Sequence, residues 1–209
     1  MILNKVDIQN LEQRYRGTFI NSLVGFKAVV LVGTKNSLGG TNLAIFNSLT
    51  HIGANPALWA LVFRPATVER HTLNNIYHTK NYTINFVNAV HYQKAHQTSA
   101  KYPLAMSEFD AVGFTPQYIA NHNAPFVQEA EIKIGLQFEE AIDIKVNGTI
   151  LVIGSINYIE LQNDLVSHDG FVALEKANIL ACTGLDAYYN TNFINRLTYA
   201  KHNTWPKII

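Results

Sequence analysis

The sequence predicts one mainly β domain, an antiparallel barrel with helices inserted between its strands. Apolar and polar residues alternate from Glu131 to Phe138, and the same phase resumes from Ile142 to Val146. The pair Asn147-Gly148 then has the residues of a two-residue hairpin turn, and a strand from Thr149 to Leu161 runs back. No internal repeat, low-complexity stretch or linker divides the sequence, so residues 1–209 are expected to form a single domain.

The first part of the chain predicts a helix followed by a buried strand. Apolar residues recur at helical spacing and predict a helix over Asn10–Leu23. Lys27–Val32 has too many β-branched residues for a good helix and predicts a buried strand.

Helices and strands then alternate toward the C-terminus. Ala57–Phe63 is a continuous apolar strand, and Thr67 and Glu69 begin a helix that runs through Tyr77. Tyr82–Val87 returns as a strand, and His91–Lys101 is a weaker, polar helix or loop. A final helix is expected near Asn192–Ala200.

The composition limits the classes of function. Charged residues make up 15% of the chain, against an ordinary level of about 25%, which fits either surface hidden in an oligomer or an uncharged, Asn-rich surface. The net charge of +1, without a basic run, predicts no nucleic-acid binding. No signal peptide and no membrane-spanning apolar run is found, and Cys182 is the single cysteine. We therefore expect a cytoplasmic protein without a membrane association.

Thr41–Pro65 is the most informative stretch for function. A short apolar segment leads into Asn47-Ser48-Leu49-Thr50, and the strand Ala57–Phe63 behind it ends on Arg64. We interpret the stretch as a ligand-binding shelf rather than a hairpin, because N–H groups flanked by polar side chains can hold an anionic or heteroaromatic ligand. Turn capping by Asn42, Asn47, Ser48 and Thr50 is the alternative, and the residues alone favour it.

Other motifs that suggest chemistry are incomplete. In the loop Gly33–Gly40 the lysine precedes the glycine pair, so no phosphate-binding loop is predicted, and no dinucleotide-binding glycine motif follows a strand. His71 and His78 are seven residues apart but lack an HExxH motif or a cysteine pair, so no metal site is expected. Cys182 lies in an apolar segment that suits an inert buried thiol.

Several segments together carry a family resemblance. They are Val29–Thr34 with the turn to Gly40, Thr41–Ser48, Arg64-Pro65, Glu69–Thr72, Asn75-Ile76, Tyr82–Val87, Ser107–Asp110, Gly113–Pro116 and Gly184–Tyr189. Their order and spacing resemble the flavin reductase-like family, the FMN-binding split barrels that include flavoredoxin, over roughly residues 11–200. The chain departs from the family at Gly25-Phe26-Lys27, where many members have Pro-Arg-Pro, and at Leu43-Ala44-Ile45, where members often have a proline.

The resemblance implies an antiparallel Greek-key split barrel that binds FMN. The segment with Phe46, Asn47 and Ser48 is expected along the isoalloxazine ring, with backbone N–H groups as far as Leu49 near the flavin carbonyls and N5. The remaining expected flavin contacts are Asn42 on the shelf, the ribityl-phosphate contacts Arg64, Thr72, Ser99 and Lys101, and Tyr188, which either packs against the flavin or fills the core.

The resemblance also implies an activity and partners. We expect a flavin reductase that moves hydride from NADH or NADPH to FMN, with no catalytic side chain of its own because the cofactor carries the chemistry. A homodimer with the flavin at the subunit interface is implied, and a partner enzyme that uses the reduced flavin is compatible with it. The alternative is a non-catalytic, FMN-binding electron-transfer protein. A pyridoxamine phosphate oxidase-type enzyme shares the barrel, but the chain lacks that family's arginine-rich phosphate pattern.

Overall fold

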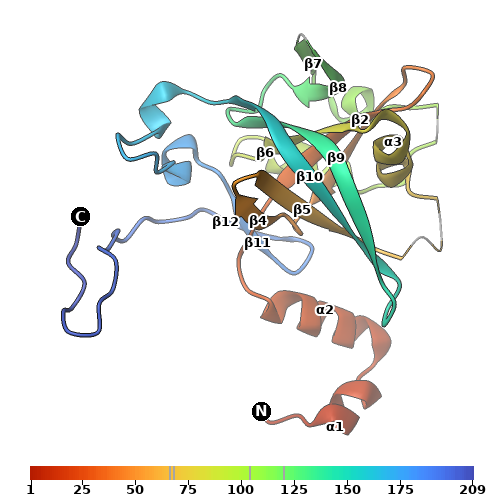
Figure 1. Cartoon of the computed structure of the whole chain (residues 1–209). Helices are drawn as coiled ribbons and strands as arrows, with labels where there is room; N and C mark the ends of the chain where they lie inside the picture. Colours follow the sequence, from red (N-terminus) through yellow and green to blue (C-terminus); the bar gives the residue numbers. More distant parts are fainter. Residues whose placement is uncertain (66, 68, 104, 120) are drawn as a thin grey trace.

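The fold is built around one curved antiparallel sheet (Figure 1). The computed structural model describes residues 1–65, 67, 69–103, 105–119 and 121–209. Within these residues, seven strands pair in the order β3-β2-β6-β9-β10-β5-β4, and β3 and β4, at the two edges, follow each other in sequence. The predicted class, a mainly β antiparallel split barrel with few helices, is confirmed.

The elements of the described residues have these bounds. The strands of the large sheet are β2 (Val30–Lys35), β3 (Thr41–Phe46), β4 (Thr50–Ala54), β5 (Ala57–Phe63), β6 (Asn81–Phe86), β9 (Lys133–Ile144) and β10 (Thr149–Glu160). The smaller sheets contain β1 (Lys27–Ala28), β11 (Ala181–Thr183) and β12 (Ala187–Tyr189), and separately β7 (Pro116–Ile119) and β8 (His122–Val127). The helices are α1 (Lys5–Asn10), α2 (Gln13–Leu23), α3 (His71–Thr79), α4 (Tyr92–Gln97), α5 (Glu108–Val112), η1 (Asn163–Leu165) and η2 (Leu174–Ala177).

The N-terminal segment differs from the single predicted helix over Asn10–Leu23. The Asn4 side chain caps α1 in a reciprocal arrangement with Asp7. The Glu12 carboxylate then accepts hydrogen bonds from the N–H groups of Arg14 and Tyr15, which starts α2 and separates it from α1. The prediction therefore missed α1 and placed the start of α2 too early.

The apolar run Lys27–Val32 forms two strands rather than one. Lys27 and Ala28 pair with β11, whereas the chain from Val30 onward joins the large sheet. Both faces of β2 are buried, since Val30 and Val32 lie in one apolar cluster and Val29 and Leu31 in the other. Burial on both sides explains why the sequence there is continuously apolar instead of alternating.

Two turns correct the sequence predictions. Residues 50–63 form a hairpin, since β4 pairs antiparallel with β5 across the turn at Asn55-Pro56, so the expectation that this stretch is not a hairpin was wrong. The long hairpin of β9 and β10 was predicted, but its turn spans residues 145–148 instead of the pair Asn147-Gly148. Gly148 has φ +73° there, a left-handed conformation that favours glycine.

The helix predicted from Thr67 and Glu69 to Tyr77 is α3, which begins later, at His71, and ends at Thr79. Residues 66 and 68 lie outside the described residues. The polar segment His91–Lys101 contains the short helix α4.

The C-terminal segment is irregular, so the helix expected near Asn192–Ala200 was wrong. Residues 190–209 leave the barrel as an extended arm (Figure 1), with isolated bridges between Leu197 and Ile208 and between Lys201 and Thr204. Asparagine and threonine side chains recur here, and they compete for backbone hydrogen bonds and lower helix propensity. Arg196 anchors the arm through Asp169, 2.6 Å away, and lies over the Phe171 ring.

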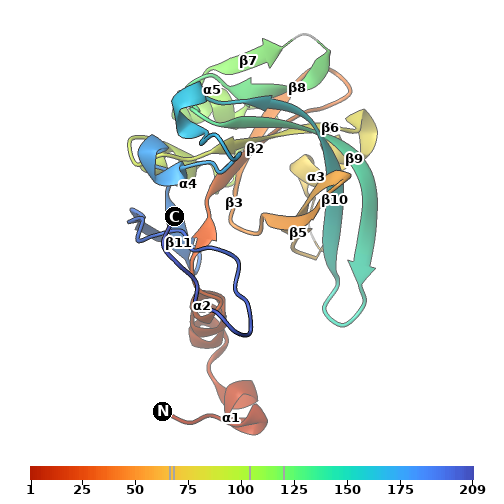
Figure 2. The ribbon, with the colours of Figure 1, turned by 60° about the vertical axis from the view of Figure 1, so that its left-hand side comes forward.

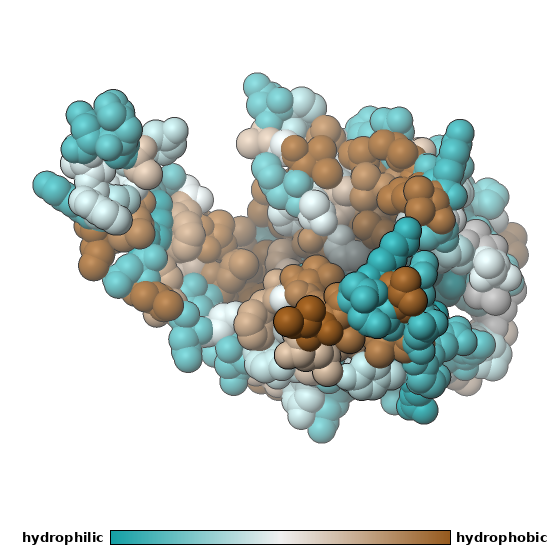
Figure 3. Space-filling model, turned by 90° about the horizontal axis from the view of Figure 1, so that it is seen from below, coloured by the Kyte–Doolittle hydropathy of each residue, from teal (hydrophilic) through white to brown (hydrophobic). Residues whose placement is uncertain are grey.

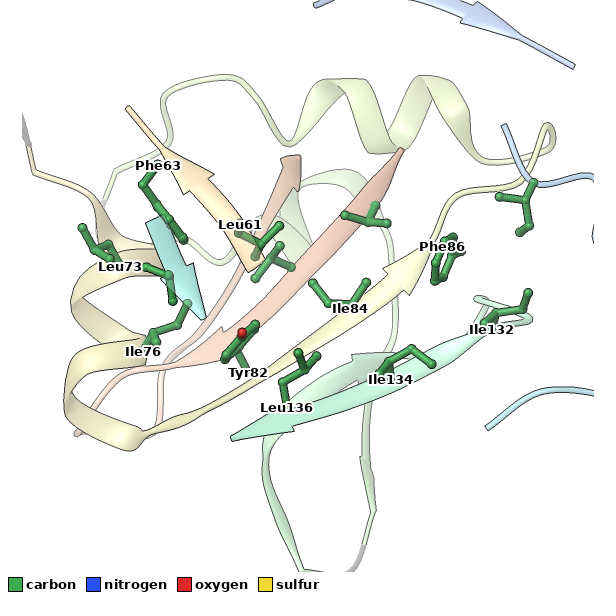
Figure 4. Packing of buried hydrophobic residues seen from close by; sticks show 14 of the residues in the cluster. Leu61, Phe63, Leu73, Ile76, Tyr82, Ile84, Phe86, Ile132, Ile134 and Leu136 are labelled. Atoms are coloured by element: carbon green, nitrogen blue, oxygen red, sulfur yellow. The ribbon is translucent and has the colours of Figure 1, made fainter. Parts of the chain in front are cut away.

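The barrel core lies between β5 and α3 on one side and β6 and β9 on the other. Figure 4 shows side chains from these elements pointing toward one another, among them Leu61, Ile76, Ile84 and Leu136, all of which are buried. A second apolar cluster covers the other face of β2 and includes Cys182, which is buried as predicted. Helix α3 thus packs its apolar face against the barrel interior and places its first turn beside β3.

His122 makes the stability of this fold depend on pH. Burial lowers the pKa of His122 and outweighs the hydrogen bond with the Tyr82 carbonyl, which raises it. Below the unfolded-state value of 6.5, the unfolded chain binds a proton that the folded chain resists, so the free energy of unfolding decreases as the pH falls.

We therefore expect urea denaturation to show a larger loss of stability between about pH 7.5 and about pH 5.5 in the parent than in His122→Phe, which cannot titrate. The His122 Nδ1 atom is buried and has no partner among the described residues, so phenylalanine removes no hydrogen bond from that atom. Equal losses in the two proteins would contradict the assignment.

Candidate functional site

The connection between β3 and β4 is held in place by the end of β5. The Ser48 hydroxyl donates to the Val62 carbonyl oxygen at 3.0 Å and accepts from the Val62 N–H at 3.1 Å. Phe46 meets Phe63 edge to face, with ring centroids 4.9 Å apart, and Leu49 packs against the core. Residues 46–49 are therefore a fixed segment of backbone, and each is only partly buried.

Within the described residues, this segment has three consecutive backbone donors without an acceptor. Among the hydrogen bonds of the described residues, none is donated by the N–H groups of Asn47, Ser48 or Leu49. Partly exposed donors on a rigid backbone can bind carbonyl or anionic groups of a ligand. The side chain of Asn47 donates to the Gly184 carbonyl oxygen at 2.7 Å, so the chain segment just before β12 also borders this surface.

A second polar group, formed by Asn42 and Thr72, lies at the start of β3, the end opposite to Phe46. Asn42 donates from Nδ2 to Thr72 Oγ1 at 3.0 Å, which joins the start of β3 to the first turn of α3. Asn42 and Phe46 lie on the same face of the strand, about 13 Å apart along it. The two groups therefore lie at opposite ends of β3 and on the same face of the strand.

Two arginines lie in the connection from β5 to α3. Arg64 follows β5 and is exposed. Arg70 is the N-cap residue of α3, and no side chain among the described residues caps this helix. The Arg70 Nη2 atom donates to the Pro65 carbonyl oxygen at 3.3 Å, but its buried Nε has no partner among the described residues. An uncapped helix N-terminus with arginines beside it favours an anion such as a phosphate.

Sequence reasoning missed Arg70. The available signal was an arginine at the start of a predicted helix, two residues before Thr72.

Ser99 and Tyr188 belong to a different group of side chains. The Ser99 hydroxyl donates to the His96 carbonyl oxygen, and His96 Nδ1 lies 2.7 Å from the Tyr188 hydroxyl. Burial, with Cys182 and Asp186 nearby, raises the pKa of Tyr188 to about 12, so this hydroxyl stays protonated near neutral pH. Tyr188 packs against the second apolar cluster, which is the core role that the sequence left open.

The proposed phosphate contacts are not linked in the structure. Lys101 is exposed, and no hydrogen bond or ion pair within the described part of the chain joins Arg64, Ser99 and Lys101. Their common role in phosphate binding stays a prediction.

A polar cavity of about 240 Å³ lies beside α3 and the β2–β3 turn. Its walls include Asn42, His71, His78 and two glutamates, Glu69 and Glu108. The Glu108 carboxylate accepts from the Leu43 N–H at 3.0 Å and so covers part of the β3 edge. Within the described residues, no three His, Cys, Asp or Glu side chains are placed to hold a metal ion.

The chain matches a known family over most of its barrel. A family model described as the flavin reductase like domain matches residues 26–175. The chain belongs to this family. The match includes both ends of β3, β5 with Arg64, and the whole of α3, so the candidate site lies inside the family domain.

Solved structures agree with this assignment. A candidate flavin reductase with a split barrel domain from Shewanella frigidimarina NCIMB 400 is 44% identical, with a TM-score of 0.92, and the match covers 96% of this chain and 100% of that one. Component B of nitrilotriacetate monooxygenase from Bacillus cereus is 18% identical, with a TM-score of 0.83 and coverage of 94% and 98%. Flavoredoxin of Desulfovibrio vulgaris is 20% identical, with a TM-score of 0.70 and coverage of 86% and 92%. The two more distant similarities show that the fold is shared.

None of the helices in the described residues of this flavin reductase-like protein is both long enough and apolar enough to cross a membrane.

Proposed function

We propose that this flavin reductase-like protein binds FMN and catalyses its reduction by NADH or NADPH. Bound flavin supplies the hydride acceptor at N5. The observation that carries the proposal is the row of N–H groups on Asn47, Ser48 and Leu49, which have no acceptor among the described residues, because reduction places negative charge on the ring system. Donors held in advance by the Ser48–Val62 contacts stabilise that charge without rearranging.

The phosphate end is assigned to the start of α3. Arg70 is the N-cap residue of this helix, Thr72 lies in its first turn, and Arg64 lies in the connection that leads from β5 to it. A phosphomonoester with nearly two negative charges favours charge-assisted donors. Asn42 holds Thr72 from the β3 side. FAD has no terminal phosphomonoester for these donors to bind, and we therefore expect FMN to bind in preference to FAD.

A flavin titration tests this assignment. We expect the protein to quench the fluorescence of FMN and to bind FMN more tightly than FAD and riboflavin. Absence of FMN binding at any concentration tested would overturn the proposed function, whereas equal binding of FMN and riboflavin would overturn only the phosphate assignment.

We further propose that the protein is a homodimer and that the second subunit completes the flavin site. None of the 11 residues of α2 is buried, yet Tyr15, Ile20 and Leu23 are exposed apolar side chains of this helix. The C-terminal arm is similar, with Ile194 at 85% and Trp205 at 92% exposure. Figure 3, which views the molecule from below, shows apolar side chains at the surface. Segments that expose this much apolar surface favour contact with another chain, and self-association is the simplest case.

Light scattering at low micromolar concentration measures this directly. We expect twice the 23.4 kDa mass of one chain, and a thermal stability that rises with FMN because only the dimer offers the complete site. Joint replacement of Ile194 and Trp205 by aspartate should weaken the dimer, while Leu38→Asp, at an exposed turn, should not. A single-chain mass with FMN bound would contradict the interface and leave the flavin assignment intact.

A further inference from the structure

Thr34 connects strand β2 to the phosphate end of the proposed site, although it cannot touch solvent. Its side chain is fully buried. The Thr34 Oγ1 atom accepts a hydrogen bond from Asn75 Nδ2 at 3.1 Å and another from Asn42 Nδ2 at 3.3 Å. One hydroxyl oxygen thus receives an amide from α3 and an amide from β3, which uses both of its lone pairs.

These contacts determine how Asn42 presents its amide group. The Asn42 amide nitrogen has two hydrogens. It donates one to Thr34 Oγ1 and the other to Thr72 Oγ1. The Thr72 hydroxyl then acts as an acceptor toward Asn42, and its own hydrogen has no acceptor among the described residues. Within the described residues, no group competes with a ligand at the first turn of α3 for that hydrogen.

We propose that Thr34 is a positioning residue for the phosphate of FMN, acting through Asn42 on the direction of the Thr72 hydroxyl. The proposal rests on the proposed function, because it assigns the phosphate to the start of α3. Asn75 completes the arrangement by tying the same oxygen to the second turn of that helix. A buried network in which several members share one acceptor fixes a single orientation for each of them.

The test compares the binding of FMN and of riboflavin, which differ only in the phosphate. Thr34→Val keeps the shape of the side chain and removes the acceptor, so Asn42 loses the contact that fixes its amide. We expect the Kd for FMN to rise about tenfold or more, the effect of one lost charge-assisted hydrogen bond, while the Kd for riboflavin changes little. Thr34→Ser, which keeps the hydroxyl, should restore the preference for FMN.

A matched control separates positioning from stability. Thr83 is an equally buried threonine on β6 whose hydroxyl donates to the Pro125 carbonyl oxygen, away from α3. Thr83→Val should lower the melting temperature and leave the ratio of the two Kd values unchanged. If Thr34→Val does not fold, Thr34→Ala provides the same comparison.

The ratio of the Kd for riboflavin to the Kd for FMN tests the positioning role of Thr34. A parent-like ratio in the Thr34 variants, or equal weakening of FMN and riboflavin, would overturn the positioning role. A parent protein that binds neither ligand would overturn the proposed function instead.

Discussion

Replacement of Asn85 by alanine should destabilise the protein by roughly 3 to 5 kcal/mol. Asn85 is fully buried on β6, and its Nδ2 donates to the Leu31 carbonyl oxygen and to Thr83 Oγ1. Its Oδ1 accepts from the Val127 N–H at 2.9 Å, which fastens β8 to the sheet. The substitution removes three hydrogen bonds and leaves the buried Val127 N–H without that acceptor.

Chemical denaturation measures this effect, and Asn81→Ala is the matched control. Asn81 lies on the same strand but is only partly buried, and its amide donates to the nearby Thr79 carbonyl oxygen. We expect the control to lose about 1 kcal/mol. Similar losses in the two variants would show that the Asn85 network does not fasten β8.

Replacement of Arg64 by alanine should weaken FMN binding by one to two orders of magnitude, or about 1.5 to 3 kcal/mol, without unfolding the protein. Arg64 follows β5 at the surface and makes no ion pair within the described residues, so its removal leaves no partner charge unpaired. The effect should be much smaller for riboflavin, which lacks the phosphate.

Fluorescence titration of each variant with FMN checks the Arg64 prediction. Arg64→Lys should retain part of the affinity because it keeps the charge but not the paired donors. Lys145→Ala removes an exposed cation at the β9–β10 turn and should bind FMN like the parent. Parent-like affinity in Arg64→Ala would remove Arg64 from the site, and failure to fold would make it a structural residue.

The strands were predictable from sequence because the core imposes clear patterns. Alternation marked β9, the turn residues after it marked β10, and continuous apolar runs marked β2 and β5. In β2 the run is apolar because both faces pack in apolar clusters. The ends of helices were less predictable. The break between α1 and α2 depends on the Glu12 carboxylate capping its own following residues, and the C-terminal arm has no core to order it as a helix.

The candidate site was partly predictable for a similar reason. Phe46, Asn47 and Ser48 lie in one unbroken segment, so their proximity follows from the sequence. The link between Asn42 and Thr72 spans 30 residues and exists only because α3 packs beside β3. Thr34 and Asn75 lie in segments that carry the family resemblance, but their link was not predictable, since a buried threonine and a helical asparagine look like ordinary structural residues until their shared hydrogen bonds are seen.

Anaerobic addition of NADH and of NADPH to the FMN-loaded protein tests the proposed activity most directly. The proposed function predicts that at least one nicotinamide bleaches the flavin absorption band, at a rate far above that of free FMN with the same nicotinamide. A band that persists with both, yet disappears with a chemical reductant such as dithionite, would contradict the reductase activity and leave a protein that only carries electrons on FMN.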